Sequence, residues 1–477
     1  MKRKWASLAV ACAATLLLSL DLTVLHLALP KLVADLDASA TQLLWIGDVY
    51  GFALAGLLIT MGNLGDRIGR KKLLLIGAVA FSAASALTAY APNPELLIAA
   101  RALLGVAGAT IMPSTLSIVR NVFTDPAERT AAVGLWSGMS AAGFAVGPVV
   151  GGLMLDHFWW GSVFLINLPI MAVVVVAGAV VLPESRGVAA RRIDLASVAL
   201  SMVGVIAVIY AVKEASVAPG VLGVAALALF AWRQTRLDEP LIDVRLFRRR
   251  AFSASILTNL LAMFVMMAMS LMFAWYFQLV LGWSPLQAGL AGLPGGLSGA
   301  LGGVLAARLI PALGRNGVVA FGLVLTSVAF GSYYFLGTET AYLPLFLAML
   351  VGGAGIGLTF TVNNDNVLAT APKERAGAAA AVSETAFELG GSLGIAILGT
   401  VLNTVYGRAM NRPGETLAET LQGTTSPEVI RQARSAFVEG VHVTALTTAG
   451  TLLVVAALAL FWLRGVPKVI EEEALVR

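Results

Sequence analysis

The sequence predicts an all-α membrane protein with fourteen transmembrane helices. Hydrophobic residues make up 58% of its 477 residues and charged residues only 12%, whereas a soluble domain is nearer half apolar and a quarter charged. The apolar residues gather in fourteen runs of spanning length, and the 49 glycines allow such helices to pack closely. The predicted spans cover approximately residues 5–29, 43–62, 72–90, 96–118, 131–155, 161–182, 195–214, 217–232, 251–281, 286–309, 316–336, 341–362, 376–403 and 436–463.

The basic residues predict how these spans are oriented. Cytoplasmic connecting segments of membrane proteins carry an excess of Lys and Arg. Counted from Lys2, alternate connecting segments hold 25 of the 32 basic residues, the intervening segments hold six, and Arg101 lies within a span. The asymmetry supports fourteen spans with both termini in the cytoplasm. We expect the protein to lie in a bacterial cytoplasmic (inner) membrane. The first run, 5–29, is too long for a signal peptide and contains Asp21, so we expect it to be retained as a span.

Several classes of function are disfavoured. The net charge of +5 comes from short loops between apolar runs, which is not the basic face of a nucleic-acid-binding protein. The single Cys12 forms no internal disulfide, and no acidic, His or Cys cluster has metal-ligand spacing. No phosphate-binding loop is present. We therefore expect no metal, no cofactor, no ATP and no enzymatic activity; a membrane enzyme or receptor would need a catalytic constellation or an effector domain.

A faint internal repeat predicts how the spans are grouped. Asp125-Pro-Ala-Glu-Arg129 precedes the fifth span and Ala371-Pro-Lys-Glu-Arg375 precedes the thirteenth. The repeat divides the chain into a six-helix bundle over residues 1–182, a linker with two extra spans over 183–250, and a second six-helix bundle over 251–477. Two facing halves with a central site are typical of secondary transporters. The alternative is that both motifs are ordinary helix starts, with Pro early and an acid in the first turn.

The only long outer segment is predicted at 404–435. It is either a hairpin over the outer mouth or a packing element without a transport role.

Three charges lie inside spans of the first half. Asp21, Asp48 and Arg101 fall at similar depths in the outer parts of the first, second and fourth spans. Charges within a membrane usually face the bundle interior, pair with one another and serve function. We predict that they form a proton-coupling or substrate site. A structural ion pair remains the alternative for Asp21 and Arg101, and a hydrated surface position for Asp48.

The second half carries its own acids. Glu384 and Glu388 are four residues apart on one helical face, close to the middle of the membrane. They are candidates for binding a proton or a lipophilic cation. Asp365, at the cytoplasmic end of the twelfth span, is expected to be a solvated cap. His26 is expected to be a polar outer-end residue.

Flexible and aromatic side chains crowd the ninth span. Such faces suit varied apolar cations through packing and cation–π contacts, although core or lipid contacts explain them equally well. The candidates for a drug lining are Met263, Met266, Met267, Trp275 and Tyr276, together with Phe387 beside the paired acids.

Two motifs lie in the loop after the second span and in the fourth span. The loop reads Gly62-Asn-Leu-Gly65-Asp66-Arg67-Ile-Gly69-Arg70-Lys71-Lys72. Its glycines permit close approach of spans, and Asp66 can pair with basic groups or with a helix N-terminus to form a latch. The fourth span carries Arg101-Ala-Leu-Leu-Gly105-Val-Ala-Gly108.

Two further motifs complete the pattern. The fifth span carries Gly143-x-x-x-Gly147-Pro148-x-x-Gly151-Gly152, where Gly and Pro permit close packing and a kink, and the first carries Leu20-Asp21-x-Thr23-Val24-x-x-x-Ala28-Leu29-Pro30. With these four motifs the chain resembles the major facilitator superfamily, and within it the fourteen-span drug:proton antiporters.

The resemblance implies a monomeric proton-coupled efflux pump with the major facilitator fold. Its cargo would be lipophilic cations such as quaternary ammonium compounds, dyes and antiseptics, with fluoroquinolones a further candidate. A transporter of an amino acid, peptide or lipid is the alternative. The chain departs from the pattern in three places: Leu293-Pro-Gly-Gly296 carries no acid, Ala307-Arg308 stands without the acid of the loop signature, and His26 replaces Asn.

Overall fold

The protein is helical throughout the part of the chain that the structure, a computed structural model, describes: residues 2–36, 40–186, 194–213, 216–237, 240–371, 376–411 and 417–463. The N-terminal half contains α1 (Lys2–Leu36), α2 (Ala40–Ile68), α3 (Arg70–Ala89), α4 (Pro94–Val122), α5 (Pro126–His157), α6 (Ser162–Leu165) and α7 (Asn167–Val181). The linker forms α8 (Leu195–Lys213) and α9 (Val217–Gln234), followed by the short η1 (Val244–Arg248).

The C-terminal half contains the remaining helices. They are α10 (Arg250–Trp275), η2 (Tyr276–Val280), α11 (Pro285–Ser332), η3 (Tyr333–Phe335), α12 (Tyr342–Thr370), α13 (Ala376–Ala409), α14 (Leu417–Gly423) and α15 (Pro427–Trp462).

Twelve helices of the described chain are long and apolar enough to cross a membrane, so the predicted fourteen spans are not confirmed. Two features account for the difference. The apolar part of α8, Leu195–Ala211, is short, and α11 counts as one long helix. A continuous helix of its 48 residues would measure ~72 Å, more than twice the ~30 Å hydrocarbon thickness. However, α11 is broken at Gly314, whose φ of 72° and ψ of 167° fit glycine alone.

Local sequence explains where the helices begin. Asn93 caps α4 by accepting a hydrogen bond from the Leu96 amide, and Asp125 caps α5 by accepting one from the Glu128 amide. Both caps are followed by proline, which suits the first helical position. One copy of the predicted repeat motif is therefore a helix start. Most of the other copy lies outside the described residues.

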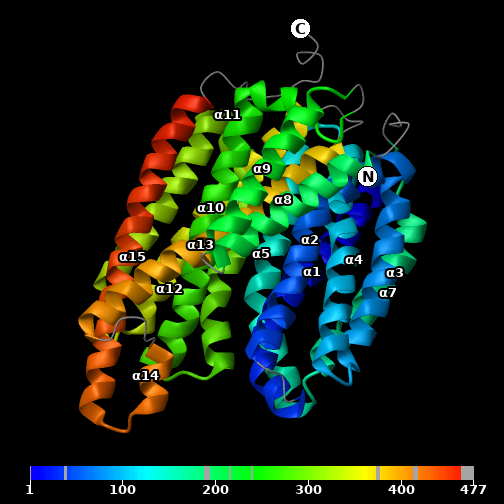
Figure 1. Cartoon of the computed structure of the whole chain (residues 1–477). Coiled ribbons are helices and arrows are strands. Elements are labelled where there is room, and N and C mark those ends of the chain that lie inside the picture. The colour runs from blue at the N-terminus through cyan, green and yellow to red at the C-terminus, as the bar shows by residue number, and fades with distance from the viewer. Residues whose placement is uncertain are drawn as a thin grey trace.

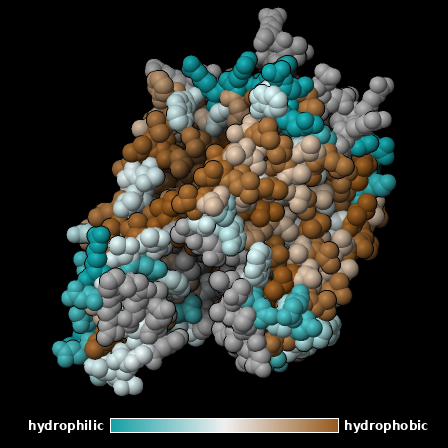
Figure 2. All heavy atoms as spheres, viewed as in Figure 1, coloured by the Kyte–Doolittle hydropathy of each residue, from teal (hydrophilic) through white to brown (hydrophobic). Residues whose placement is uncertain are grey.

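Both the first and the last long helix reach the same end of the molecule, where α1 begins and α15 ends (Figure 1). We call this end the first face, and the opposite end, where α14 lies, the second face. Space-filling colours show a broad apolar band between polar residues at the two ends (Figure 2). Figure 2 also shows the molecule hollowed at the second face, between two lobes.

The two halves meet closely toward the first face. Gly134 of α5 lies against Gly303 of α11, and Gly62 of α2 lies against Gly377 of α13. A Cβ atom on any of these four glycines would overlap the partner's backbone. Small residues at such contacts let helix backbones approach without side chains between them.

The linker helices lie on the outside of the seam between the halves. Phe52 and Ala55 of α2 form a small cluster with Val205 and Ile209 of α8, and Leu389 of α13 packs against it. In the predicted outer loop, α14 is tied to α13 through the hydroxyl groups of Tyr406 and Thr420, 2.6 Å apart. Within this segment, residues 412–416 lie outside the described residues.

Candidate functional site

Asp21 and Arg101 lie together inside the N-terminal half. Their exposed fractions are only 2% and 1%. Arg101 Nη1 lies 3.6 Å from Asp21 Oδ2, and neither atom hydrogen-bonds to the described residues. Arg101 Nε instead donates to the Ile46 carbonyl at 3.2 Å. The structure thus brings together two of the three charges expected at one depth, in an ion pair loose enough to separate. The side chains of Asp48 and His26 lie outside the described residues.

Asn167, at the start of α7, holds the other oxygen of the Asp21 carboxylate. Its amide nitrogen donates to Asp21 Oδ1 at 2.8 Å and to the hydroxyl of Ser85 at 3.0 Å. No site role was assigned to Asn167 from the sequence. The signal that could have found it is an amide within an apolar helix, because a fully buried amide needs partners.

Aromatic rings cover the Arg101 guanidinium. Its Cζ lies 4.8 Å from the ring centre of Tyr50 and 5.8 Å from that of Phe164. A desolvated cation gains up to ~2 kcal/mol from such a ring face. The rings therefore stabilise the cation when Asp21 is neutral as well as when it is ionised.

Glu384 and Glu388 lie one turn apart on α13, in the C-terminal half. Glu384 is 5% exposed and Glu388 is half-buried. Glu384 Oε1 has no hydrogen-bond partner among the described residues. An ionised carboxylate in such a site is costly unless a proton or a bound cation neutralises it. The two acids therefore form a site that can bind either a proton or a cation.

The candidate lining residues divide into two groups. Met263 and Met267 of α10 face α13 just beyond the acids, since a Cβ on Gly391 would lie 4.0 and 3.0 Å from their Cγ atoms. Met266 is half-buried on the same helix, and Phe387 packs against Phe360 with ring centres 5.1 Å apart.

The other two lining candidates lie further along the chain. The fully buried Tyr276 belongs to the hydrophobic core, where its hydroxyl donates to the Gly337 carbonyl at 2.7 Å, and the neighbouring Trp275 packs near Phe437.

Asp66 at the end of α2 binds the start of α13. Its carboxylate accepts hydrogen bonds from the backbone amides of Gly377 and Ala378 at 3.2 and 3.3 Å. Arg70 lies 2.7 Å from the same carboxylate and is itself buried. A negative charge at a helix N-terminus is favourable.

Gly69 makes the turn between α2 and α3 with a φ of 113°, a conformation that favours glycine. Arg67 is exposed.

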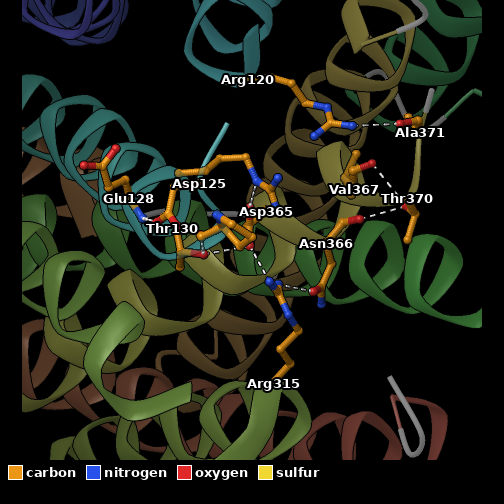
Figure 3. A network of polar contacts seen from close by, with 12 residues as sticks. Arg120, Asp125, Glu128, Thr130, Arg315, Asp365, Asn366, Val367, Thr370 and Ala371 are labelled. Atoms are coloured by element: carbon orange, nitrogen blue, oxygen red, sulfur yellow. Dashed lines mark hydrogen bonds and ion pairs between the residues drawn. The ribbon is translucent and has the colours of Figure 1, made fainter. Parts of the chain in front are cut away.

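Asp365 is the hub of a second link between the halves, shown in Figure 3. It is 0% exposed, so the expectation of a solvated cap is wrong. Arg129 Nε of α5 lies 2.7 Å from Asp365 Oδ1, and Arg315 Nη2 of α11 lies 2.6 Å from Oδ2. The Thr130 hydroxyl also donates to Oδ2, at 2.8 Å. The prediction failed because these partners are remote in sequence.

Asp365 of α12 supplies the carboxylate that the second-half loop after Ala307-Arg308 lacks. Arg315 follows the break at Gly314 and also donates to Asn366 Oδ1 at 2.7 Å. The carboxylate that it needs comes from α12 rather than from the loop itself. Arg120 at the end of α4 adds a further link, donating to the Ala371 carbonyl at 3.1 Å (Figure 3).

Two glycines of the fifth-span motif pack against α1 within the N-terminal half, and a third lies near α11 of the other half. A Cβ on Gly143 would meet the Leu16 carbonyl, and one on Gly147 would overlap the Thr23 hydroxyl, both on α1. Gly151 is buried, and a Cβ on Gly152 would lie 3.9 Å from Leu286 of α11. The side chain of Pro148 lies outside the described residues.

Two linked halves with buried acids in each half are the arrangement typical of secondary transporters. Residues 11–395 match the Major Facilitator Superfamily, and the chain belongs to this family of transporters. The resemblance inferred from the sequence motifs is thereby confirmed.

Similar proteins include a multidrug efflux pump and two drug or toxin resistance proteins. Multidrug efflux pump LfrA of Mycolicibacterium smegmatis is 39% identical, covering 95% of both chains. Methyl viologen resistance protein SmvA of Salmonella typhimurium is 33% identical over 97% of this chain and 98% of its own. Puromycin resistance protein pur8 of Streptomyces alboniger is 33% identical over 96% of this chain and 91% of its own. The human organic anion transporter MFSD10 shares the fold, with a TM-score of 0.66 at 16% identity over 97% of this chain and 99% of its own.

Proposed function

We propose that this chain is a proton-coupled multidrug efflux antiporter that exports lipophilic cations. The observation that carries the proposal is the placement of buried carboxylates in both halves: Asp21 beside Arg101 in one, and Glu384 with Glu388 in the other. The names of the relatives support a drug cargo. Quaternary ammonium compounds, dyes and antiseptics are the proposed substrates, with fluoroquinolones a further group.

The two carboxylate sites have different proposed tasks. The Arg101 charge already balances Asp21, so this pair offers little attraction to a cation but can take up or release a proton. Glu384 has an unpartnered oxygen, and Met263 and Met267 of α10 face α13 at Gly391, one turn beyond Glu388. Soft methionine faces and acids together suit an apolar cation. Hence we assign proton coupling to Asp21 and cation binding to the Glu384 and Glu388 site.

The proposed topology has fourteen spans, with the first face in the cytoplasm of a bacterial cell and the protein working as a monomer. The division of α11 at Gly314 and the apolar run of α8 support the count. In this orientation the protein is outward-open. The cytoplasmic face is closed by the Asp66 and Asp365 links, and the hollow of Figure 2 faces outward.

The proposed cycle follows from charge balance. A cation enters from the cytoplasm or inner leaflet when both links are open and pairs with an ionised acid. The halves then rock until the first face closes, as in the structure described here. Protons from outside neutralise the acids and release the cation. Each return from the outward-open to the inward-open state must break the Asp66 and Asp365 links. These links therefore contribute to the free-energy barrier of that conformational change.

Proton flux is the direct test of this function. Purified protein in proteoliposomes should move protons when tetraphenylphosphonium is added on one side, and a protonophore should abolish concentrative efflux in cells. Accumulation of the cation that ignores the protonophore would contradict coupling. A transporter of an amino acid, peptide or lipid is the alternative, and failure of cationic dyes to compete for binding would favour it.

A further inference from the structure

Tyr50 of α2 is a buried phenol whose hydroxyl group has no hydrogen-bond partner among the described residues. The side chain is 1% exposed. Leaving a buried hydroxyl unpaired costs free energy, whereas phenylalanine would fill the same space without that cost. The ring alone could serve the cation–π contact with Arg101. The hydroxyl therefore needs a separate explanation.

The fourth-span motif is built around Tyr50. Arg101 lies 4.8 Å from the ring centre. One turn further along α4, a Cβ on Gly105 would overlap the Tyr50 carbonyl oxygen, and at the next turn a Cβ on Gly108 would lie 3.3 Å from the Tyr50 hydroxyl. Both glycines thus make room for this residue, one for its backbone and one for its hydroxyl. The α4 face that carries Arg101 holds Tyr50 in a fixed position.

Tyr50 also lies level with Glu388 of the other half. Helices α2 and α13 run antiparallel and touch at Gly62 and Gly377. Tyr50 is twelve residues before Gly62 and Glu388 is eleven residues after Gly377, so both lie ~16–18 Å from that contact, at ~1.5 Å per residue. Their chain neighbours Phe52 and Leu389 meet in one cluster with α8. On its other side Tyr50 is joined to the Asp21 site through Arg101, whose guanidinium lies 4.8 Å from the Tyr50 ring centre and 3.6 Å from the Asp21 carboxylate.

We propose that Tyr50 is the residue that passes protons between the Asp21 site of the N-terminal half and the Glu388 site of the C-terminal half. This inference rests on the proposed proton-coupled function. The hydroxyl, which has no partner among the described residues in this closed arrangement of the first face, reaches the two carboxyl groups when the halves rock: it gives its proton to the ionised carboxylate on one side and receives a proton from the protonated carboxyl on the other. The phenol is restored, and the net change is one proton moved from one carboxyl group to the other.

The relay links the two proposed tasks. A proton that enters at Asp21 reaches Glu388 and neutralises the acid that holds the cation. Without the relay, proton uptake at Asp21 and cation release at α13 become separate events. The cation is still bound and still crosses when the halves rock.

The test replaces Tyr50→Phe, which keeps the ring and removes the hydroxyl alone. Protein in proteoliposomes is assayed for proton flux driven by tetraphenylphosphonium, for binding of that cation, and for its exchange across the membrane at equal pH. We expect proton flux to fall at least about 100-fold, the lower end of the usual effect of removing a positioned acid–base group. Binding and exchange should stay within about twofold of the unmodified protein, because the acids on α13 are unchanged.

Tyr333→Phe is the matched control, because Tyr333 is a buried tyrosine in the core of the C-terminal half. It should leave all three measurements unchanged. Proton flux in Tyr50→Phe equal to that of the control would overturn the relay, and so would an equal loss of binding and exchange, which would indicate a structural role. If the unmodified protein moves no protons with the cation, the proposed coupling fails, and the relay with it.

Discussion

Arg129 Nε and Asp365 Oδ1 lie 2.7 Å apart although they are 236 residues apart in sequence and belong to different halves. Both side chains are almost fully buried. Asp365 also binds Arg315, so that one carboxylate faces two guanidinium groups. Together with the contact of Asp66 to the start of α13, this arrangement holds the first face closed.

Removing the Asp365 charge should destabilise the closed first face. Asp365→Asn leaves Arg129 and Arg315 buried beside a neutral group, which typically costs roughly 3–5 kcal/mol. We expect the Tm of the purified protein to fall by several degrees. Asp194→Asn is the control, because Asp194 pairs with Arg233 in the linker, where both side chains are partly exposed. Hydrogen bonds from Arg233 hold the pKa of Asp194 below its usual value, but exposed pairs contribute little to stability. Equal Tm changes would contradict a central role for Asp365.

Neutralising Asp66 should open the first face. Asp66→Asn keeps the shape of the side chain but loses its charge against the α13 N-terminus and Arg70, an effect of about 1–2 kcal/mol. Spin labels at Lys72 and Arg308, which are exposed in different halves near the first face, should report a longer mean distance. Glu95→Gln, an exposed acid near the second face, should leave the distance unchanged. An unaltered distance in Asp66→Asn would argue against the latch.

The tight contact between Gly134 and Gly303 should tolerate no side chain. Gly134→Ala places a Cβ onto the Gly303 carbonyl, so the halves must separate there. We expect a lower Tm and slower transport, because overpacking typically costs about 1–3 kcal/mol. Gly292→Ala is matched to it, since nothing lies within 4 Å of a Cβ at that position of α11. A Tm for Gly134→Ala as high as that of Gly292→Ala would show that the closed face is less tightly packed than described.

Asp21→Asn should abolish proton-driven efflux while the cation still binds. The change removes the titratable group but keeps a side chain that can contact Asn167. Efflux of every lipophilic cation from cells should then become insensitive to a protonophore and fall at least about 100-fold. Asn167→Ala should give a smaller loss, since it leaves the carboxyl group in place without its holder. Full proton-driven efflux by Asp21→Asn would remove Asp21 from the coupling site.

Glu384→Gln and Glu388→Gln should weaken binding of a lipophilic cation without preventing folding. Each change removes a negative charge from the proposed cation site, and a tenfold weaker affinity corresponds to about 1.4 kcal/mol. We expect the dissociation constant of tetraphenylphosphonium to rise at least about tenfold for the more important acid. Glu439→Gln, an exposed acid on α15, is the control. Unchanged affinity in both variants would move the cation site away from α13.

The sequence by itself determined that this is a helical membrane protein, where most helices lie and which charges lie inside them. These properties follow from local composition and from the high cost of polar groups in lipid. The four motifs also identified the family. The span count was less secure, because the short apolar run of α8 and the continuous α11 with its break at Gly314 depend on geometry that composition does not record.

Only the tertiary structure decided which groups meet. Asn167 reaches Asp21 across 146 residues, Arg129 reaches Asp365 across 236 and Asp66 reaches the amides of α13 across more than 300. No local pattern encodes such pairs, because they depend on how separate helices face one another. The same reason explains why Asp365 was expected in solvent and why the contacts of Tyr50 with Arg101 and with the glycines of α4 were not predicted.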